Sequence, residues 1–459
     1  MVLLDIVRSA YSVVRIPYLQ TSRLGNVTIR NTNYAILSRN LPRRFVPHSA
    51  FSIPNSAFME TATSAAERLA ERLSERIRSV PQSGIRRFFE IAATMEDVIS
   101  LGIGEPDFVS PRPIIDAAVA SLEAGKTGYT ANLGLIELRE AVADEMQRLY
   151  GVGYNPANEI IVTVGASEAM MIAMLALVDP GDEVLIPEPC FVSYGPLAQF
   201  AGGKVVWVPT RAENDFQVTA EDIEARITDK TKLLFLGYPN NPTGAVLRRE
   251  TLEKIAEVVL RHDLFVLSDE IYDRLVYGEA YNEGHTCIPS IDGLWDRTIM
   301  LNGFSKGYAM TGWRIGFACA PKPIMDEMYK AHQYVVMSAP TMGQWGALAG
   351  IREAQEDVEQ MRQAYDARRR VIVDGLNAGG LPTFEPEGAF YAFPDITSTG
   401  LSSEDFAQRL LEEEHVACVP GDAFGPSGAG YLRCSYANSL ENVTEAVRRI
   451  TRFADNVRS

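Results

Sequence analysis

Residues 302–316 read NGFSKGYAMTGWRIG and lie between two short apolar runs, TIML at 298–301 and IGFAC at 315–319. Apolar runs of this length predict buried strands. Lys306 therefore falls on a glycine-rich loop between two expected strands of one sheet. A lysine in a confined, partly desolvated place loses proton affinity and becomes a usable amine nucleophile.

Two neighbours of Lys306 give the loop a second chemical property. Ser305 and Arg314 could together hold an anionic group, most simply a phosphate. The three residues are suited to a lysine that forms a Schiff base with a phosphorylated aldehyde. The alternative is a surface lysine in a glycine-rich turn. For an arbitrary lysine that alternative is the better one, so the rest of the chain has to decide.

The composition of the 459-residue chain predicts a globular protein of two domains. The net charge of −16 argues against nucleic acid and against anionic membranes as partners. Five scattered cysteines include no C-x-x-C pair, so we expect neither a disulfide framework nor a metal site. Reduced thiols of this kind are typical of a cytoplasmic protein.

Residues 1–58 differ from the rest of the chain, because they contain seven arginines, no lysine and a single acid, Asp5. An acid-poor, arginine-rich segment with serines resembles a transit peptide, and this one lacks the apolar core of a secretory signal. A misplaced start codon is the alternative, with Met59 as the true first residue. We expect a dispensable or disordered extension and take the working protein from about residue 59.

From residue 160 onward, short apolar runs alternate with helical patterns. Strands are expected at 160–164, 183–186, 204–208, 232–236, 264–267 and 298–301, with helices at 168–177, 194–200 and 248–261. The alternation predicts an α/β sheet that is mostly parallel, and such sheets bind ligands at the carboxyl ends of their strands. Loops after four of these strands carry Phe191, Asn241, Asp269 and Lys306. One shared site explains them more simply than four unrelated structural loops.

A second anion-binding candidate is the turn Gly165-Ala166-Ser167, which precedes the helix expected from Glu168. Such a turn offers backbone N–H groups and a hydroxyl to an anion. An N-cap serine without a ligand explains the turn equally well when it is taken alone. A P-loop at 125–127 is rejected, because Ala120 stands where that motif needs glycine.

Six motifs, in this order, resemble the class I, pyridoxal-phosphate-dependent aminotransferases of fold type I. They are GEPDF at 104–108, NPTG at 241–244, SDEIY at 268–272, SK at 305–306, GWRIG at 312–316 and YLRCSY at 431–436. The match runs from about residue 85 to the end of the chain. Each motif alone is weak, but together they indicate the family, with a pattern similar to the bacterial aspartate, alanine and aromatic aminotransferases.

The resemblance implies an α/β architecture with two domains. The large domain would span residues 128–341 and hold a mostly parallel seven-stranded sheet between helices. A smaller α+β domain, discontinuous in sequence, would combine residues 59–127 and 342–459. One long helix expected at 341–377 would link the two, with most of its charge on a solvated face. In this family the smaller domain commonly closes over substrate, which would exclude water.

The resemblance also implies a role for each candidate residue. Lys306 would carry pyridoxal phosphate and move a proton at the substrate α-carbon, and Asp269 would keep the ring nitrogen protonated. Tyr272 and Asn241 would hydrogen-bond the phenolic oxygen, and Asn241 would also line the substrate site. The ring would stack on Phe191, and the phosphate would be cradled by Gly165, Ala166, Ser167, Ser305 and Arg314.

Substrate and subunit contacts follow from the same resemblance. Arg433 would clamp the substrate α-carboxylate, helped by the backbone N–H of Gly104. Tyr129 would reach the phosphate of a neighbouring subunit, which implies a homodimer with shared sites. The chain departs from the family pattern at Gly303, where relatives often have serine, and at Phe191, where many have tryptophan or tyrosine.

The expected reaction moves the amino group of an L-amino acid to a 2-oxo acid, most simply 2-oxoglutarate, by a ping-pong mechanism. A carbon–sulfur β-lyase on the same fold is the first alternative. A non-catalytic regulatory module is the second, but it would need loss of Lys306 or Asp269 or an added DNA-binding domain, and the sequence shows neither. Aspartate, alanine, aromatic and branched-chain donors all stay open.

Overall fold

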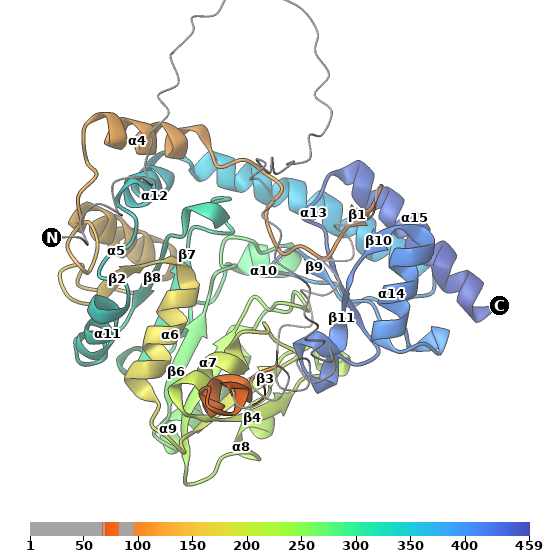
Figure 1. The fold of residues 1–459 in the computed structure, drawn as a ribbon, viewed down its shortest axis with the longest axis horizontal. Helices are drawn as coiled ribbons and strands as arrows, with labels where there is room; N and C mark the ends of the chain where they lie inside the picture. The colour runs from red at the N-terminus through yellow and green to blue at the C-terminus, as the bar shows by residue number, and fades with distance from the viewer. Residues whose placement is uncertain (1–66, 68, 82–94, 96) are drawn as a thin grey trace, which may run out of the picture. The chain divides into compact units, whose positions relative to one another are not determined.

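The computed structural model describes residues 67, 69–81, 95 and 97–459 (Figure 1). The expected extension, residues 1–58, lies outside the described residues. Residues 69–459 form one compact unit, and the fold below is that of this unit. The short helix α2 (Glu75–Arg78) lies near the start of this unit in sequence.

A seven-stranded sheet in the order β2-β8-β7-β6-β5-β3-β4 forms the centre of this unit. Within it, β8 runs antiparallel to both of its neighbours, and the remaining pairs are parallel. The predicted mostly parallel α/β sheet is therefore confirmed. The strands are β2 (Ile160–Thr163), β3 (Glu183–Glu188), β4 (Lys204–Pro209), β5 (Thr231–Gly237), β6 (Phe265–Asp269), β7 (Thr298–Gly303) and β8 (Gly316–Cys319).

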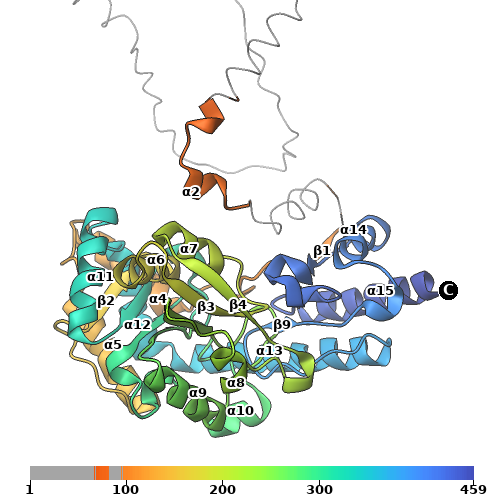
Figure 2. The ribbon, with the colours of Figure 1, turned by 90° about the horizontal axis from the view of Figure 1, so that it is seen from below.

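Helices cover both faces of the sheet, because alternate side chains of each buried strand point to opposite sides. Val184 and Ile186 pack into one apolar cluster, whereas Leu185 between them packs into another. The first face is covered by α6 (Gly165–Leu177), α7 (Tyr194–Ala201) and α11 (Lys322–Val335) (Figure 2). The opposite face is covered by α5 (Ile136–Tyr150), α9 (Arg249–Arg261) and α12 (Thr341–Glu353).

The C-terminal part of the chain builds two smaller sheets. Three strands pair antiparallel in the order β11-β12-β9, and β1 pairs in parallel with β10. These strands are β1 (Ile99–Ser100), β9 (Tyr391–Ala392), β10 (Val416–Ala417), β11 (Val419–Pro420) and β12 (Leu432–Ser435). The remaining helices are α4 (Arg112–Glu123), α8 (Ala220–Glu224), α10 (Gly278–Glu283), α13 (Gln355–Ala378), α14 (Ser403–Glu414) and α15 (Leu440–Arg458).

The single long helix expected at 341–377 is wrong. The chain forms α12 and α13 instead, and Ala354 between them leaves helical geometry at φ −110° and ψ 20°. The solvated charged face expected there is also wrong for three arginines, which are buried in ion pairs. These pairs join Arg362 to Glu359, Arg368 to Asp107, and Arg369 to Asp366 and Glu385. Buried guanidinium groups require such partners.

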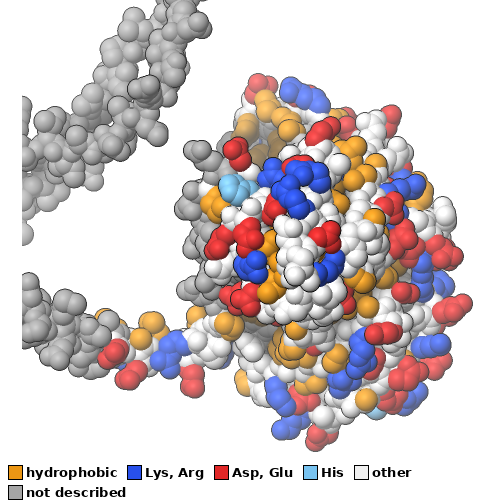
Figure 3. All heavy atoms as spheres, turned by 90° about the vertical axis from the view of Figure 1, so that its right-hand side faces the viewer, with side chains coloured by type: hydrophobic (Ala, Val, Ile, Leu, Met, Phe, Trp, Pro, Cys, Tyr) orange, Lys and Arg blue, Asp and Glu red, His pale blue; other side chains and the backbone are white. Residues whose placement is uncertain are grey.

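Figure 3 views the side on which α15 lies in Figure 1, and acidic and basic side chains are interspersed there. Exposed pairs on α14 and α15 include Arg409 with Glu413 and Arg448 with Glu445. Pairs of this kind contribute little stability each. None of the helices in the described part of the chain combines the length and the apolar run that a bilayer crossing requires.

Candidate active site

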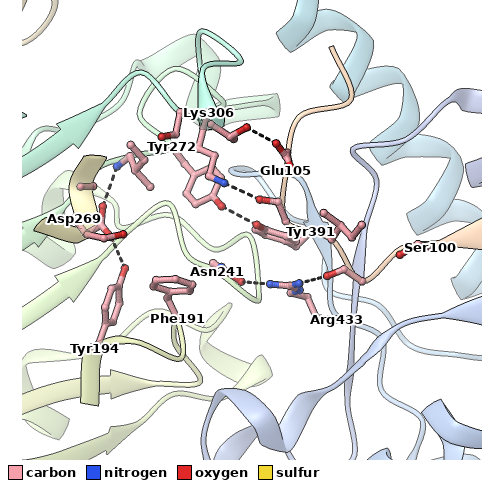
Figure 4. Close-up of a pocket in the computed structure, with 18 of the residues that line it drawn as sticks. Ser100, Glu105, Phe191, Tyr194, Asn241, Asp269, Tyr272, Lys306, Tyr391 and Arg433 are labelled. Carbon is pink, nitrogen blue, oxygen red and sulfur yellow. Dashed lines mark hydrogen bonds between the residues drawn. The ribbon is translucent and has the colours of Figure 1, made fainter. Parts of the chain in front are cut away.

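A cavity of about 950 Å³ opens at the carboxyl ends of β3, β5, β6 and β7, four strands that are adjacent in the sheet. The loops after these strands bring Phe191, Asn241, Asp269 and Lys306 to its wall (Figure 4). In Figure 4, Asp269 and Tyr194 lie on one side, Arg433 and Tyr391 lie on the other, and Lys306 reaches between them. Further candidates on the wall are Gly104, Ala166, Ser167, Tyr272, Ser305 and Arg314.

Lys306 lies three residues beyond the end of β7, with its Nζ donating to the backbone oxygen of Gly104 at 2.6 Å. Burial, together with the positive charges of Arg433 and Arg314, lowers the pKa of Lys306 to about 8. About a tenth of the amine is therefore uncharged and nucleophilic at pH 7, against well under 0.1% for an ordinary lysine. Gly303, the departure noted above, is explained by packing: a Cβ there would lie 3.0 Å from the Cα of Gly316 on β8.

Asp269 ends β6 and is 4% exposed. Its Oδ2 accepts a hydrogen bond from the hydroxyl of Tyr194 (2.8 Å), and its Oδ1 accepts one from the N–H of Ile271 (3.3 Å). Burial raises the pKa of this carboxyl to about 6. A cationic group in the cavity would favour the ionised form, so the site is suited to a protonated ring nitrogen. Tyr194 was missed from the sequence, although its place at the start of α7, just after the β3 loop, was a signal.

Two tyrosines form a hydrogen-bonded pair across the cavity. The hydroxyls of Tyr272 and Tyr391 lie 2.7 Å apart, and burial raises the pKa of both phenols. Both therefore stay neutral, and the hydroxyl whose proton is not used in the bond between them can donate to a ligand oxygen. Tyr391 was also missed from the sequence. Its ring lies 4.6 Å from the guanidinium of Arg433, so it supports the opposite side of the cavity as well.

Arg433 comes from β12 and is 3% exposed. One of its amino groups donates to Oδ1 of Asn241 at 3.0 Å, and the other donates to the backbone oxygen of Gly102. Its Nε has no partner among the described residues. A buried guanidinium with an unused N–H group is equipped to bind a carboxylate. Asn241 lies beside this guanidinium, where it can contact both a ring and a substrate.

The turn at the start of α6 is pressed against Arg314. Gly165 has φ +69°, and a Cβ on it would lie 2.5 Å from Nη2 of Arg314, so only glycine fits this approach. Helix α6 begins at Gly165, and the expected start at Glu168 is three residues too late. Ser167 therefore lies within the first turn, where free backbone N–H groups and the helix dipole attract an anion.

The position of Tyr129 differs from that of the other candidates. Its side chain is 83% exposed, and it does not line the cavity of its own chain. Gly165 does not line the cavity either, but it lies against Arg314, which does. The chain thus brings an amine, a carboxylate, a carboxylate clamp and an anion-binding turn to one cavity. This set of groups fits pyridoxal phosphate with an amino acid beside it.

Comparison with known proteins gives one consistent result. The family model for aminotransferase class I and II matches residues 96–450. A putative aminotransferase, YugH, of Bacillus subtilis is 52% identical over 82% of this chain and 97% of its own length. An aspartate aminotransferase of Pyrococcus abyssi is 46% identical over 82% of this chain and 96% of its own. The crystal structure of an aromatic aminotransferase from Pyrococcus horikoshii superposes with a TM-score of 0.77 at 44% identity, covering 81% of this chain and 99% of that one.

Proposed function

The chain belongs to aminotransferase class I and II, and we propose that it transfers the amino group of an L-amino acid to 2-oxoglutarate. It is a transaminase that depends on pyridoxal phosphate and acts on amino acids and 2-oxo acids. The observation that carries the proposal is the meeting of Lys306, Asp269 and Arg433 in one cavity. These three supply the amine, the ring-nitrogen partner and the carboxylate clamp that amino-group transfer needs.

The residues of the strand ends hold the cofactor. When bound, pyridoxal phosphate supplies an electron sink that stabilises negative charge at the substrate α-carbon. Asp269 maintains the proton on the ring nitrogen, because its buried carboxylate is stabilised by a positive partner. With the cofactor bound, Phe191 would support its ring, and Tyr272 and Asn241 would bind its phenolic oxygen. The phosphate is held by Gly165, Ala166, Ser167, Ser305 and Arg314.

Lys306 and Arg433 act on the substrate. Arg433 binds the α-carboxylate through its buried guanidinium, whose unused Nε–H supports this role. The backbone N–H of Gly104 adds a second donor to the same carboxylate. Lys306 moves the proton at the α-carbon, because its lowered pKa lets the amine both take and return a proton near neutral pH.

A second copy of the chain completes each site in a homodimer, with Tyr129 reaching the phosphate of its neighbour. The outward position of Tyr129 supports this arrangement, as do the nearby exposed apolar side chains of Tyr334 (86% exposed) and Met337 (47% exposed). Residues 97–127 and 342–459, the described part of the small domain predicted from the sequence, close over substrate bound on the large domain, residues 128–341. Five buried free thiols support a cytoplasmic location.

A donor panel tests the reaction. The purified holoenzyme is mixed with single amino acids and 2-oxoglutarate, and glutamate is measured together with the cofactor absorption. Aspartate and phenylalanine come first, because relatives are named for aspartate and aromatic donors. We expect a donor to convert the cofactor to its amine form and to yield glutamate. Release of ammonia and pyruvate from cysteine, without glutamate from any donor, would contradict the proposal.

A further inference from the structure

A buried histidine–glutamate pair lies behind the turn assigned to the phosphate. His332 on α11 is fully buried, and its Nδ1 lies 2.6 Å from Oε1 of Glu168. The second oxygen of Glu168 accepts a hydrogen bond from the N–H of Val164 at 2.5 Å. Glu168 therefore joins the core histidine to the backbone of Val164, the N-cap residue of α6.

This pair has no part in the chemistry described above. Glu168 does not line the cavity, whereas Ser167, the residue before it, does. Nε2 of His332 has no partner among the described residues. Within that part of the chain, the ring therefore makes its hydrogen bond to Glu168 alone. The imidazole donates its Nδ1–H to Glu168, because a carboxylate only accepts. The buried N–H of His332 bonds to the carboxylate of Glu168 and thereby restricts the position of that carboxylate.

The position of Glu168 controls the shape of the turn. Val164 is the N-cap residue of α6, and its own side chain provides no cap. The carboxylate of Glu168 satisfies the backbone N–H of Val164. That bond holds the Thr163–Val164 peptide, through which the chain enters the turn at Gly165, whose φ is +69°. Backbone N–H groups bind an anion well only when they point at one place. Glu168 also carries negative charge at the helix end assigned to the phosphate, so it has to be held away from the cavity.

We propose that His332 and Glu168 are positioning residues for the phosphate of the cofactor. His332 anchors Glu168 outside the cavity, and Glu168 holds the turn formed by Gly165, Ala166 and Ser167 in its anion-binding shape. The proposal rests on the function proposed above, because it requires pyridoxal phosphate in the cavity with its phosphate at this turn.

The test compares two ligands that differ only in the phosphate. Pyridoxal phosphate and pyridoxal are titrated separately into the apo form of the full chain, and dissociation constants are obtained from the absorption of the bound chromophore. His332→Leu removes the donor and places an apolar side chain at the same position in the core. We expect it to weaken pyridoxal phosphate about ten-fold, the effect of losing a hydrogen bond to a charged group. Pyridoxal should change by less than about two-fold, because it makes no phosphate contact.

Two further variants separate positioning from general damage to the core. His332→Asn places an amide N–H near the position of Nδ1 and should restore the preference for pyridoxal phosphate. His285→Leu is the matched control, because His285 forms another buried pair, with Glu270 at 2.7 Å, behind Asp269 rather than behind the phosphate turn. That variant should leave the ratio of the two dissociation constants as in the wild type.

An unchanged ratio in His332→Leu, with both ligands still bound, would overturn the proposal. So would an equal loss of both ligands, because that result describes a purely structural residue. If His332→Leu does not fold, the ratio measured with Glu168→Gln decides in the same way. Failure of the proposed function gives a different result: the wild-type chain would then bind neither ligand at Lys306.

Discussion

The two sides of the cavity are assembled in different ways. Asp269 and Lys306 follow β6 and β7, which are neighbouring parallel strands, so the strand order alone brings them together. Arg433 bonds to Gly102, which is 331 residues away in sequence, and it is held by segments that meet only through packing. The cofactor side is thus fixed by local topology, and the substrate side is fixed by long-range contacts. Loss of one side should therefore leave the other measurable.

Burial also shifts the pKa values of the two groups on the cofactor side in opposite directions. It lowers the pKa of Lys306 to about 8 and raises the pKa of Asp269 to about 6, because it disfavours the charged form of each. The pKa values of both groups therefore lie within about one unit of neutral pH before any ligand binds. Each group can exchange a proton there. Arg433 contributes to this balance, because its positive charge also lowers the pKa of Lys306.

The largest effect is expected from Lys306→Ala. Removing the base that moves the α-proton should lower kcat by about 10⁴-fold or more. Steady-state transamination measures it. Lys322→Ala, on an exposed residue paired with Asp326, is the matched control and should keep wild-type activity. Activity of Lys306→Ala within ten-fold of the wild type would contradict the assignment of Lys306 as the base on the cofactor side.

Arg433→Ala should lower kcat/KM by about 10² to 10³-fold, because it removes a buried charged partner of the substrate carboxylate. Affinity for pyridoxal phosphate should change much less, by about a few-fold, because Arg433 acts on the cofactor side only through Asn241 and through the pKa of Lys306. Arg409→Ala, on the exposed surface of α14, is the control. An equal loss of cofactor and substrate binding would show that the two sides are not separable.

The pH dependence of cofactor attachment tests the poise of Lys306. The ordinary lysine pKa of 10.5 is lowered to about 8, so the uncharged amine grows about ten-fold per pH unit up to pH 8 and then levels off. The rate at which the apo chain binds pyridoxal phosphate, followed by absorption, should have this profile. A rate that keeps rising to about pH 10 would mean that burial does not lower the pKa of Lys306.

The smallest effect is expected from Tyr391→Phe. It removes one hydrogen bond to Tyr272 next to Arg433 and should lower kcat/KM about five-fold. The change should fall on KM more than on the cofactor absorption, because Tyr391 supports the substrate side. Tyr431→Phe, a partly buried tyrosine outside the cavity lining, is the control. A change confined to the cofactor absorption would assign Tyr391 to the cofactor side of the cavity instead.

The sequence was enough for the features that strand order determines. Short apolar runs predicted the parallel strands, and the polar residues after them were assigned to one edge of the sheet. The place of Tyr194 just after the β3 loop was a signal that went unused, whereas Tyr391 was missed because its contacts depend on packing that no local pattern reveals. The same reason applies to Arg368, whose partner Asp107 lies 261 residues away and turns a charge expected to be solvated into a buried ion pair.

Helix boundaries were the other weak point. The start of α6 was placed three residues late, because glycine and serine were interpreted as a turn although Gly165 already adopts the first helical position. The break at Ala354 carries no proline or glycine signal, and tertiary packing ends one helix there. Both errors concern positions at which the surrounding structure overrides local preference.

One measurement tests the central assignment most directly. The holoenzyme is reduced with borohydride, which makes the link between cofactor and lysine permanent, and it is then digested for peptide mass spectrometry. We predict the mass of the reduced cofactor on Lys306 alone among the lysines, and no labelled peptide from Lys306→Ala. A label on any other lysine, with Lys306 unmodified, would contradict the account.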